Sequence, residues 1–330
     1  MNVRGQRPAV IGFDTSNYRT SAAVVTLDGE ILADYRELLP VSEGERGLRQ
    51  SEAVFAHIRQ LRNCEQLIRS QADGVRIAAV AASVKPRDAE DSYMPVFQVG
   101  HTMGSVLAAT LNVPFYETTH QRGHLAAALH GTALERTDQM LALHLSGGTT
   151  DLLKIDGETI TRLGGSADLH AGQLVDRAGV AMGLPFPSGE ALEALAVCGK
   201  SEGRLGCSLE QGDLICHLSG TETRVQQWIR NTESDPKDIA REIYDLLART
   251  IVRMLKAGAM KTGFSKALVT GGVASSFLLR QLLEDRRRKT AGCPVMMFGK
   301  PERSGDNAVG VALIGVKQLK SGQNEIWGGL

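Results

Sequence analysis

The sequence predicts an α/β fold built from two related domains, and three observations point to it. The chain has 330 residues, which is enough for two ordinary domains with full hydrophobic cores. Short apolar runs rich in β-branched residues alternate with longer segments of helical periodicity. The same opening pattern of strands and turns occurs twice, once at the start of the chain and once near its middle. This duplication predicts two domains of common architecture.

The first copy of the pattern begins at residue 9. Three short strands are joined by a polar turn and an Asp-Gly turn, which is the pattern of a β-meander. These strands and turns are expected at residues 9–13, 14–17, 21–26, 27–30 and 31–35. Alternating helices and strands then follow, at residues 51–71 (helix), 75–83 (strand), 99–111 (helix), 113–116 (strand) and 120–129 (helix).

The second copy begins at residue 140, and its residues match those of the first copy only at the turns. Its strands and turns are expected at residues 140–145, 146–150, 151–155, 156–157 and 159–163. Two meanders, each followed by helices, predict the actin-like ATPase architecture, in which two related domains clamp a nucleotide. We expect domains at 1–135 and 136–330, the second with a helical insertion at about 168–262. The last helix, 308–319, is a candidate to pack back on the first domain.

The rest of the second half continues the alternation. A helical region is broken by a Pro- and Gly-containing segment at 185–189, and the stretch from 199 to 222 is expected to be irregular. The remaining elements are expected at residues 168–198 (helical), 235–262 (helix), 266–270 (strand), 275–285 (helix) and 295–298 (strand).

Composition and charge exclude several classes of protein. Hydrophobic residues make up 42% and charged residues 22% of the chain, as in a water-soluble globular protein, and the net charge is +0. Unaided nucleic-acid binding is usually accompanied by a basic excess. The one basic run, 286–289, is read as a solvated helix end, with a phosphate-binding patch as the alternative. Five cysteines without a CxxC pair, no signal-peptide pattern and no long apolar stretch predict a cytoplasmic protein.

The strongest chemical signal is the segment HQRGH, which places His120 and His124 four residues apart. On a helix these positions share one face, which suits two ligands of one metal ion. Spacing alone also allows two ordinary surface histidines. Asp306, at an Asp-Asn turn before the last helix, is the leading candidate for a third ligand. A helix N-cap is the alternative for this aspartate.

Two glycine-rich turns follow buried strands and are candidate phosphate or nucleotide loops. Ser146, Gly147, Gly148 and Thr149 form the first, for which a simple hairpin is the alternative. Gly271 and Gly272 stand between a strand and a helix, where helix–strand packing is the alternative. The sequence contains no P-loop, no dinucleotide fingerprint and no Gly-x-Ser-x-Gly motif.

Together these segments resemble one family over nearly the whole chain, the TsaD family of tRNA N6-adenosine threonylcarbamoyltransferases. Members of this family were once called O-sialoglycoprotein endopeptidases. The order and spacing of the matching segments agree with the family. These segments are IGFDTSNYRTSAAVV, THQRGH, LHLSGGTTDLL, GGSADLHAGQLVDRAGVAMGLPFPSG, ALVTGGVASSFLLRQLL and SGDNAVGVALIG.

The resemblance implies an Fe²⁺ or Zn²⁺ ion held by His120, His124 and Asp306. It also implies transfer of threonylcarbamoyl from threonylcarbamoyl-AMP to N6 of adenosine 37 in tRNA, with TsaB-like and TsaE-like protein partners. Peptidase activity is not expected, because HQRGH lacks the glutamate of HExxH. The residues expected to contact the donor or another ATP-like nucleotide are Thr15, Ser16, Ser146, Gly147, Gly148, Thr149, Asp168, Gly183, Gly271, Gly272 and Ser276.

The chain also departs from the family pattern near the expected donor site. Tyr18 and Arg19 stand where two acidic residues are usual, Thr149 replaces a histidine, and Ser276 replaces an asparagine. The segment 168–177 lacks one aspartate and one glutamate of the family, and 85–91 replaces a Pro-Gly-rich stretch. A carbamoyl or acyl-adenylate transferase acting on a small molecule, and a non-catalytic TsaB-like scaffold, are therefore alternative functions.

Overall fold

The computed structural model describes residues 6–16, 18–40, 48–89, 92–231 and 234–322. Residue 17, in the predicted opening turn, and residues 90–91, in the stretch 85–91 that differs from the family pattern, lie outside the described residues. The chain divides into two compact units. The first comprises residues up to His130 together with those from Gly305 onward, and the second comprises Gly131–Ser304. The boundary therefore falls at 130–131, where the sequence suggested 135–136, and the C-terminal segment groups with the first unit.

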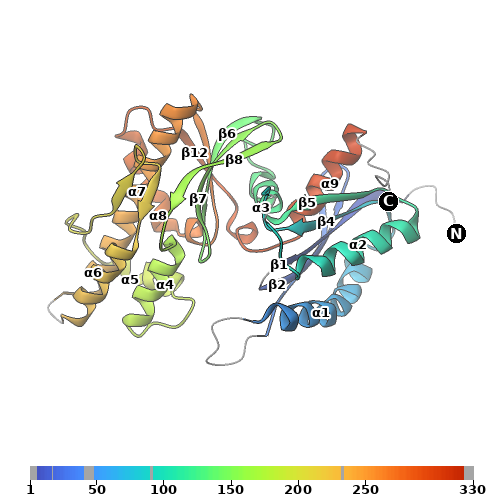
Figure 1. Ribbon diagram of the computed structural model, residues 1–330, viewed down its shortest axis with the longest axis horizontal. Coiled ribbons are helices and arrows are strands. Elements are labelled where there is room, and N and C mark those ends of the chain that lie inside the picture. The colour runs from blue at the N-terminus through green and yellow to red at the C-terminus, as the bar shows by residue number, and fades with distance from the viewer. Residues whose placement is uncertain (1–5, 17, 41–47, 90–91, 232–233, 323–330) are drawn as a thin grey trace. The chain divides into compact units, whose positions relative to one another are not determined.

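The first unit contains a five-stranded sheet in the order β3-β2-β1-β4-β5 (Figure 1). The first three strands form the expected antiparallel meander, whereas β4 and β5 run parallel to β1. The three central strands are buried on both faces, which explains why their sequences read as nearly continuous apolar runs. The strands are β1 (Arg7–Ser16), β2 (Arg19–Thr26), β3 (Ile31–Leu38), β4 (Val75–Lys85) and β5 (Phe115–Thr119).

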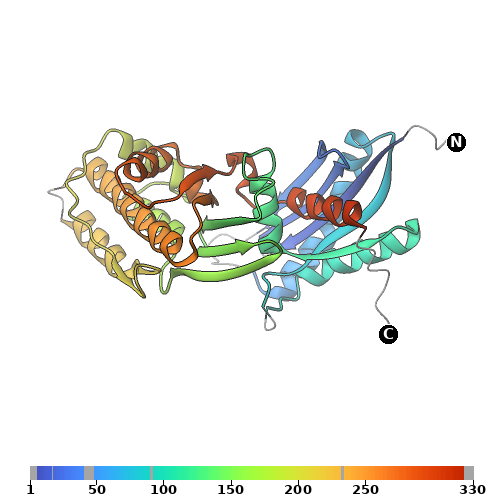
Figure 2. The ribbon, with the colours of Figure 1, turned by 90° about the horizontal axis from the view of Figure 1, so that it is seen from above.

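Helices cover both faces of this sheet (Figures 1 and 2). On one face, Ile11 and Phe13 pack in an apolar cluster with residues of α1 and α2. On the other face, Val10 packs with residues of α9, which also contacts α3. The C-terminal helix is therefore part of the first unit's core. The helices are α1 (Gln50–Gln71), α2 (Phe97–Leu111), α3 (His120–Leu129) and α9 (Val309–Ser321).

A buried histidine of α1, His57, contacts the meander and is held neutral. The Thr20 hydroxyl lies 2.6 Å from Gln60 Oε1, to which it donates, and 2.7 Å from His57 Nδ1. The Gln60 amide nitrogen donates to Leu38 O, which fixes the orientation of that amide. His57 Nδ1 must therefore carry a proton and donate to Thr20, which leaves Nε2 without a partner among the described residues. Burial lowers the pKa of His57 to about 4.

We expect this histidine to make folding stability depend on pH. The unfolded chain binds a proton at His57 near pH 6.5, whereas the folded chain does so only near pH 4. The free energy of unfolding is therefore unaffected by His57 above pH 6.5. As the pH drops towards 4, it falls by on the order of 3 kcal/mol. Urea unfolding of the wild type and His57→Gln at several pH values measures this. An equally steep dependence in both proteins between pH 6.5 and 4 would contradict the prediction.

The second unit contains a seven-stranded sheet in the order β12-β11-β6-β7-β8-β10-β9. Strands β6, β7 and β8 form the second antiparallel meander, and β11 and β12 extend it in parallel with β6. The strands are β6 (Gln139–Leu145), β7 (Thr150–Asp156), β8 (Thr159–Ser166), β9 (Ser208–Glu210), β10 (Ile215–His217), β11 (Lys266–Thr270) and β12 (Val295–Phe298).

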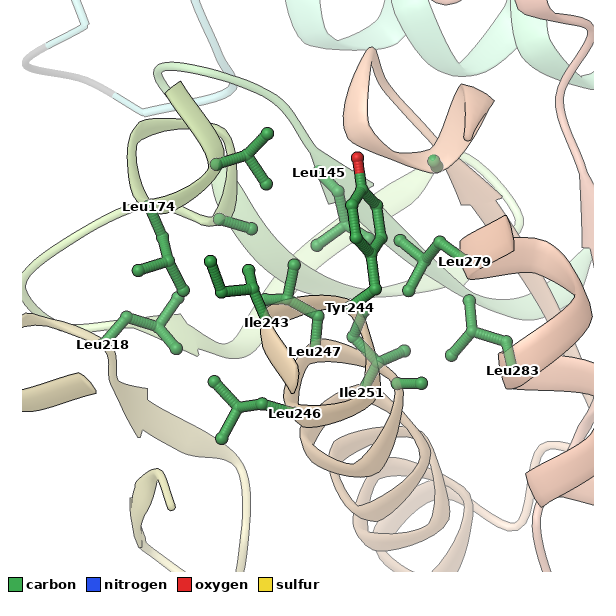
Figure 3. Packing of buried hydrophobic residues seen from close by; sticks show 14 of the residues in the cluster. Leu145, Leu174, Leu218, Ile243, Tyr244, Leu246, Leu247, Ile251, Leu279 and Leu283 are labelled. Atoms are coloured by element: carbon green, nitrogen blue, oxygen red, sulfur yellow. The ribbon is translucent and has the colours of Figure 1, made fainter. Parts of the chain in front are cut away.

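The long helix α7 forms the centre of this unit's core. Its residues Ile243, Tyr244 and Leu247 lie among leucines contributed by β6, α4 and α8 (Figure 3). Almost every turn of α7 is buried on at least one side, which explains its length and its strong apolar periodicity. The helices are α4 (Ala171–Ala181), α5 (Gly189–Val197), α6 (Ser219–Arg230), α7 (Pro236–Thr262) and α8 (Phe277–Arg288).

Most elements expected from the sequence are confirmed, but the prediction that residues 199–222 are irregular is wrong in part. Residues 208–217 form the hairpin β9–β10, which joins the sheet beside β8, and α6 begins at Ser219. These strands have three residues each, so they are too short to show a period in the sequence. Among the described residues, no helix is both long and apolar enough to cross a membrane.

Candidate metal centre

The two histidines of HQRGH lie on the first turns of α3. Thr119 ends β5 and caps the helix, because its side chain accepts a hydrogen bond from Arg122 N at 3.3 Å. The helix therefore starts at His120, and His124 follows one turn later on the same face. The two imidazole rings meet nearly edge to face, with centroids 4.3 Å apart. His124 is buried, whereas His120 is partly exposed.

Asp306 reaches the histidines from the loop before α9. The neighbouring Asn307 takes the capping role, because its side-chain oxygen accepts a hydrogen bond from Val309 N at 3.1 Å. The Asp306 carboxylate instead faces α3, with Oδ1 at 3.1 Å from His124 Nε2 and 3.5 Å from His120 Nε2. The helix-cap alternative for this aspartate therefore does not describe its contacts.

The three donor atoms are spaced as ligands of one small cation would be. The two Nε2 atoms lie 3.0 Å apart, and all three ligand atoms lie within 4.8 Å of one another. Ligands about 2.1 Å from a tetrahedral ion lie about 3.4 Å from one another. Small shifts of these side chains would therefore bring all three atoms to bonding distance. Two imidazoles and a carboxylate are ligands that both Zn²⁺ and Fe²⁺ accept.

A fourth residue, Asp14, orients His120. Both carboxylate oxygens lie close to His120 Nδ1, at 3.0 and 3.1 Å, and the Ser83 hydroxyl donates to the same carboxylate. Asp14 is fully buried at the end of β1. A protonated Nδ1 that donates to Asp14 leaves the Nε2 lone pair directed towards Asp306 and His124. This carboxylate–histidine arrangement is the one that holds metal-binding imidazoles in place in proteins.

The electrostatics of the centre favour a positive charge among the carboxylates. Burial disfavours the imidazolium form of His120, but the charges and hydrogen bonds of Asp14 and Asp306 outweigh burial and raise its pKa to about 10. Burial also opposes ionisation of Asp306, yet the two histidines hold its pKa well below the usual value. The site thus keeps an ionised carboxylate beside a bound proton, and a metal cation would displace that proton.

Replacing Asp14 with asparagine is expected to weaken metal binding by about 10- to 100-fold, because the charge that fixes the His120 ring is lost while its size is kept. Competition with a fluorescent chelator for Zn²⁺ measures this affinity. Asp73→Asn, an exposed position of the same unit, is the matched control. An unchanged affinity in Asp14→Asn would remove the orienting role assigned to this residue.

The two glycine loops lie in the second unit, at one edge of its sheet. Strands β6 and β11 pair in parallel with Thr270 opposite His144, so loops 146–149 and 271–272 leave the same strand ends. Gly271 has φ +102°, and a Cβ there would lie 2.2 Å from Leu145 O, so glycine is required. Gly147, Gly148 and Gly272 have open space around them. The carboxyl ends of parallel strands are where α/β sheets commonly bind ligands.

The N-terminus of α4 packs against the first of these loops. Gly172 N donates to Ser146 O at 3.1 Å, and Ala171 N donates to the Thr150 hydroxyl at 2.9 Å. The loop itself is closed by a hydrogen bond from Ser146 N to Thr149 O. Two of the first helical N–H groups therefore fix the loop, which leaves the exposed backbone of Gly147 and Gly148 to face a ligand.

Several other expected contact residues have structural partners. Thr15 joins β1 to α2, accepting from Gly100 N and donating to Val96 O. Asp168 accepts from Leu218 N and from Ser219 at the start of α6, and although burial opposes this, these hydrogen bonds lower its pKa to about 2. Ser276 caps α8 through Leu279 N. Gly183 occupies a turn at φ +81°, and the buried Ser16 hydroxyl has no partner among the described residues.

The polar residues predicted as a turn after the first strand lie at the end of β1, and the one among them that contacts His120 was not predicted. Thr15 and Ser16 were named, whereas the residue that contacts His120 is Asp14. A sequence signal for this residue exists, because Asp14 directly follows an apolar run. A carboxylate there is costly to bury unless it has a partner. Nothing local to the sequence, however, identifies that partner as a histidine 106 positions away.

The architecture is shared with solved structures of low sequence identity. HypF in a phosphate- and nucleotide-bound form matches with a TM-score of 0.59 and 12% identity, over 98% of this chain and 48% of that one. The ROK hexokinase from Thermus thermophilus matches with a TM-score of 0.55 and 16% identity, over 95% of this chain and 99% of that one. The activator of 2-hydroxyisocaproyl-CoA dehydratase from Clostridium difficile, with bound ADPNP, matches with a TM-score of 0.54 and 13% identity. The match covers 98% of this chain and 99% of that one.

The chain spans about half the length of the HypF chain and nearly all of the other two. Two meander-based units and these likenesses define a protein of the actin-like ATPase fold. The family model described as TsaD, tRNA N6-adenosine threonylcarbamoyltransferase, matches residues 92–300, which is more than half of the chain. The chain therefore belongs to the TsaD family. His120 and His124 lie inside the matched segment, and Asp306 lies just beyond its end.

Proposed function

We propose that this protein transfers a threonylcarbamoyl group from threonylcarbamoyl-AMP to N6 of adenosine 37 in tRNA. The observation that carries the proposal is the convergence of His120, His124 and Asp306 on one point in a member of the TsaD family. The reaction joins the adenosine amine to the carbamoyl carbon and breaks the bond from that carbon to the phosphate oxygen. AMP leaves with the electron pair, and the amine loses a proton.

His120, His124 and Asp306 would hold one Fe²⁺ or Zn²⁺ ion, which when bound supplies Lewis-acid polarisation. Asp14 would keep the His120 ring in place. The backbone of Gly147, Gly148 and Gly272 would lie against the nucleotide part of the donor, because a Cβ at these positions would meet only open space. We place the reaction in the cytoplasm, with TsaB-like and TsaE-like proteins as partners.

The proposal is tested by nucleoside analysis of tRNA after incubation. Purified protein, metal, threonylcarbamoyl-AMP, unmodified tRNA and a TsaB-like partner are expected to yield N6-threonylcarbamoyladenosine, detected by mass spectrometry. His124→Ala is expected to yield none. An unfolding midpoint equal to that of the wild type verifies that this variant folds. If this chain gives no product where another TsaD family member does under the same conditions, the proposal fails. Full activity with no metal bound would also overturn the assigned role of the triad.

A second candidate function is favoured by Arg19, which follows the opening turn. Its Nη1 lies 3.4 Å from the position of a Cβ on Gly305, the residue directly before Asp306. Among the described residues, no carboxylate pairs with this guanidinium. An unpaired cation beside the triad would bind a carboxylate or phosphate group. This placement favours transfer of a carbamoyl or acyl group involving a small anionic molecule.

Kinetics of Arg19→Ala separate the two candidates. If Arg19 binds a small anionic acceptor, its removal should raise the KM for that acceptor about tenfold or more and leave the KM for the donor nearly unchanged. If tRNA is the acceptor and Arg19 contacts only the donor, the KM for threonylcarbamoyl-AMP should rise instead. Wild-type protein that binds metal yet modifies neither kind of acceptor would favour the non-catalytic scaffold.

A further inference from the structure

A hollow of about 880 Å³ lies in the second unit between α7, the C-terminal end of α8 and the β9–β10 turn. We call it the α7–α8 groove. Its lining is partly apolar, with Val252, Ala257 and Met260, and Met260 is strongly exposed. Its charged lining residues are Asp213, Arg249, Arg253, Lys256, Lys261, Arg286 and Lys289.

The groove carries a local positive charge that the neutral chain as a whole does not have. Arg249 and Arg286 share the carboxylate of Asp245, and Arg253 forms a two-point ion pair with Asp213. No carboxylate of the described residues pairs with the three lysines, Lys256, Lys261 and Lys289. Six cations against two carboxylates leave an excess of four positive charges at one place.

The basic run at 286–289 is only partly a solvated helix end. Arg287 and Arg288 both pair with Glu284, one turn earlier on α8, and Arg286 turns inward to Asp245. Lys289 follows the end of the helix and lines the groove. Its ammonium group therefore adds to the lysines of α7, and within the run 286–289 it is the cation that no carboxylate of the described residues pairs with.

The cations on α7 are spread along the C-terminal half of the helix. Arg249, Arg253 and Lys256 recur at helical spacing and therefore share a face, and Lys261 lies further along the same helix. From residue 249 to residue 261 the helix rises about 18 Å. One phosphate group is far shorter than this span, whereas a nucleic-acid strand presents several phosphates along it. The exposed Met260 offers an apolar contact to a ribose or base beside them.

We propose that the α7–α8 groove binds the phosphodiester backbone of an RNA strand. The inference rests on the proposed function in one respect, since the strand is then part of the tRNA whose adenosine is modified. The lysines act as sequence-independent contacts, which position a nucleic acid without reading its bases. This assigns an RNA contact to the second unit in a chain whose net charge alone gives no sign of one.

The test is direct binding of an unmodified tRNA transcript to the full-length protein, measured by fluorescence anisotropy without donor or metal. Lys256→Glu/Lys261→Glu/Lys289→Glu is expected to weaken binding about tenfold or more and to lower the salt slope by about 2. The matched control is Lys200→Glu/Arg224→Glu/Lys237→Glu, which reverses three exposed cations of the same unit. The first variant also has a milder form, with glutamine at the same positions, and unfolding midpoints verify that all variants fold.

The proposal is supported if the control variant binds tRNA as tightly as the wild type and both groove variants bind it more weakly. Equal losses in the groove and control variants, or none in either, would overturn it, as would wild-type protein that binds inorganic triphosphate but no tRNA. Because no donor is present, a failed modification assay with intact tRNA binding would count against the proposed function and leave the groove in place.

Discussion

Replacing Asp306 with alanine is expected to lower the affinity for Zn²⁺ or Fe²⁺ by more than about 100-fold and to abolish transferase activity. The side chain supplies the one anionic donor of the triad, and its Oδ1 lies within 3.5 Å of both Nε2 atoms. Without it, two imidazoles remain, and the raised pKa of His120 loses one of its two supporting charges.

Metal content and thermal stability measure this together. Wild-type protein is expected to bind about one ion per chain and to gain stability when metal is added, because a ligand that binds only the folded state shifts the equilibrium. Asp306→Ala should show neither effect. Asp73→Ala removes an exposed carboxylate of the same unit and should behave as wild type. One tightly bound ion per chain in Asp306→Ala would show that the ligands lie elsewhere.

Replacing Gly310 with alanine is expected to cost about 3 kcal/mol or more of folding free energy and to impair metal binding as well. A Cβ at Gly310 would lie 1.8 Å from Gly123 O and 2.8 Å from Ala127 N, both in the backbone of α3. Neither atom can move unless α3 and α9 separate. Gly123 stands between the two histidines, so separation of the helices would pull Asp306 away from them.

Chemical unfolding and chelator competition check this prediction. The denaturation midpoint and the Zn²⁺ affinity of Gly310→Ala should both fall. Gly220→Ala in α6 is the control, because a Cβ there meets nothing within 4 Å and alanine favours a helix by about 0.5–1 kcal/mol. A Gly310→Ala protein as stable as the wild type would mean that α3 and α9 are less closely packed than their backbones indicate.

Much of the secondary structure and part of the candidate centre could be predicted from the sequence because the signals are local. Strands β1 and β6 read as apolar runs, and α7 has a strong helical period over 27 residues. The spacing of His120 and His124 suffices to place both on one helix face. The short hairpin β9–β10 has no such signal, because three-residue strands contain less than two periods of alternation.

The third ligand was a candidate from its place at an Asp-Asn turn, but no local rule selects it, and only the family resemblance singled it out. Asp306 lies 182 positions from His124, and by itself it reads as an ordinary cap. The structure shows Asn307 in the capping position instead. Asp168 and Ser276, expected at the donor site, accept hydrogen bonds from backbone N–H groups at helix starts. Polar residues at helix starts serve both purposes, so their type alone does not separate capping from ligand contact.

By itself, the sequence determined the duplicated meanders, the long core helix and the pair of histidines on α3, since each depends on periodicity or spacing within one segment. Tertiary structure alone decided that Asp14 orients His120 and that three lysines gather at the α7–α8 groove. It also placed α9, which the sequence offered only as a candidate for this position, on the first sheet. These features join residues that are far apart in the chain. Their contacts exist only after burial of apolar surface has brought separate elements together.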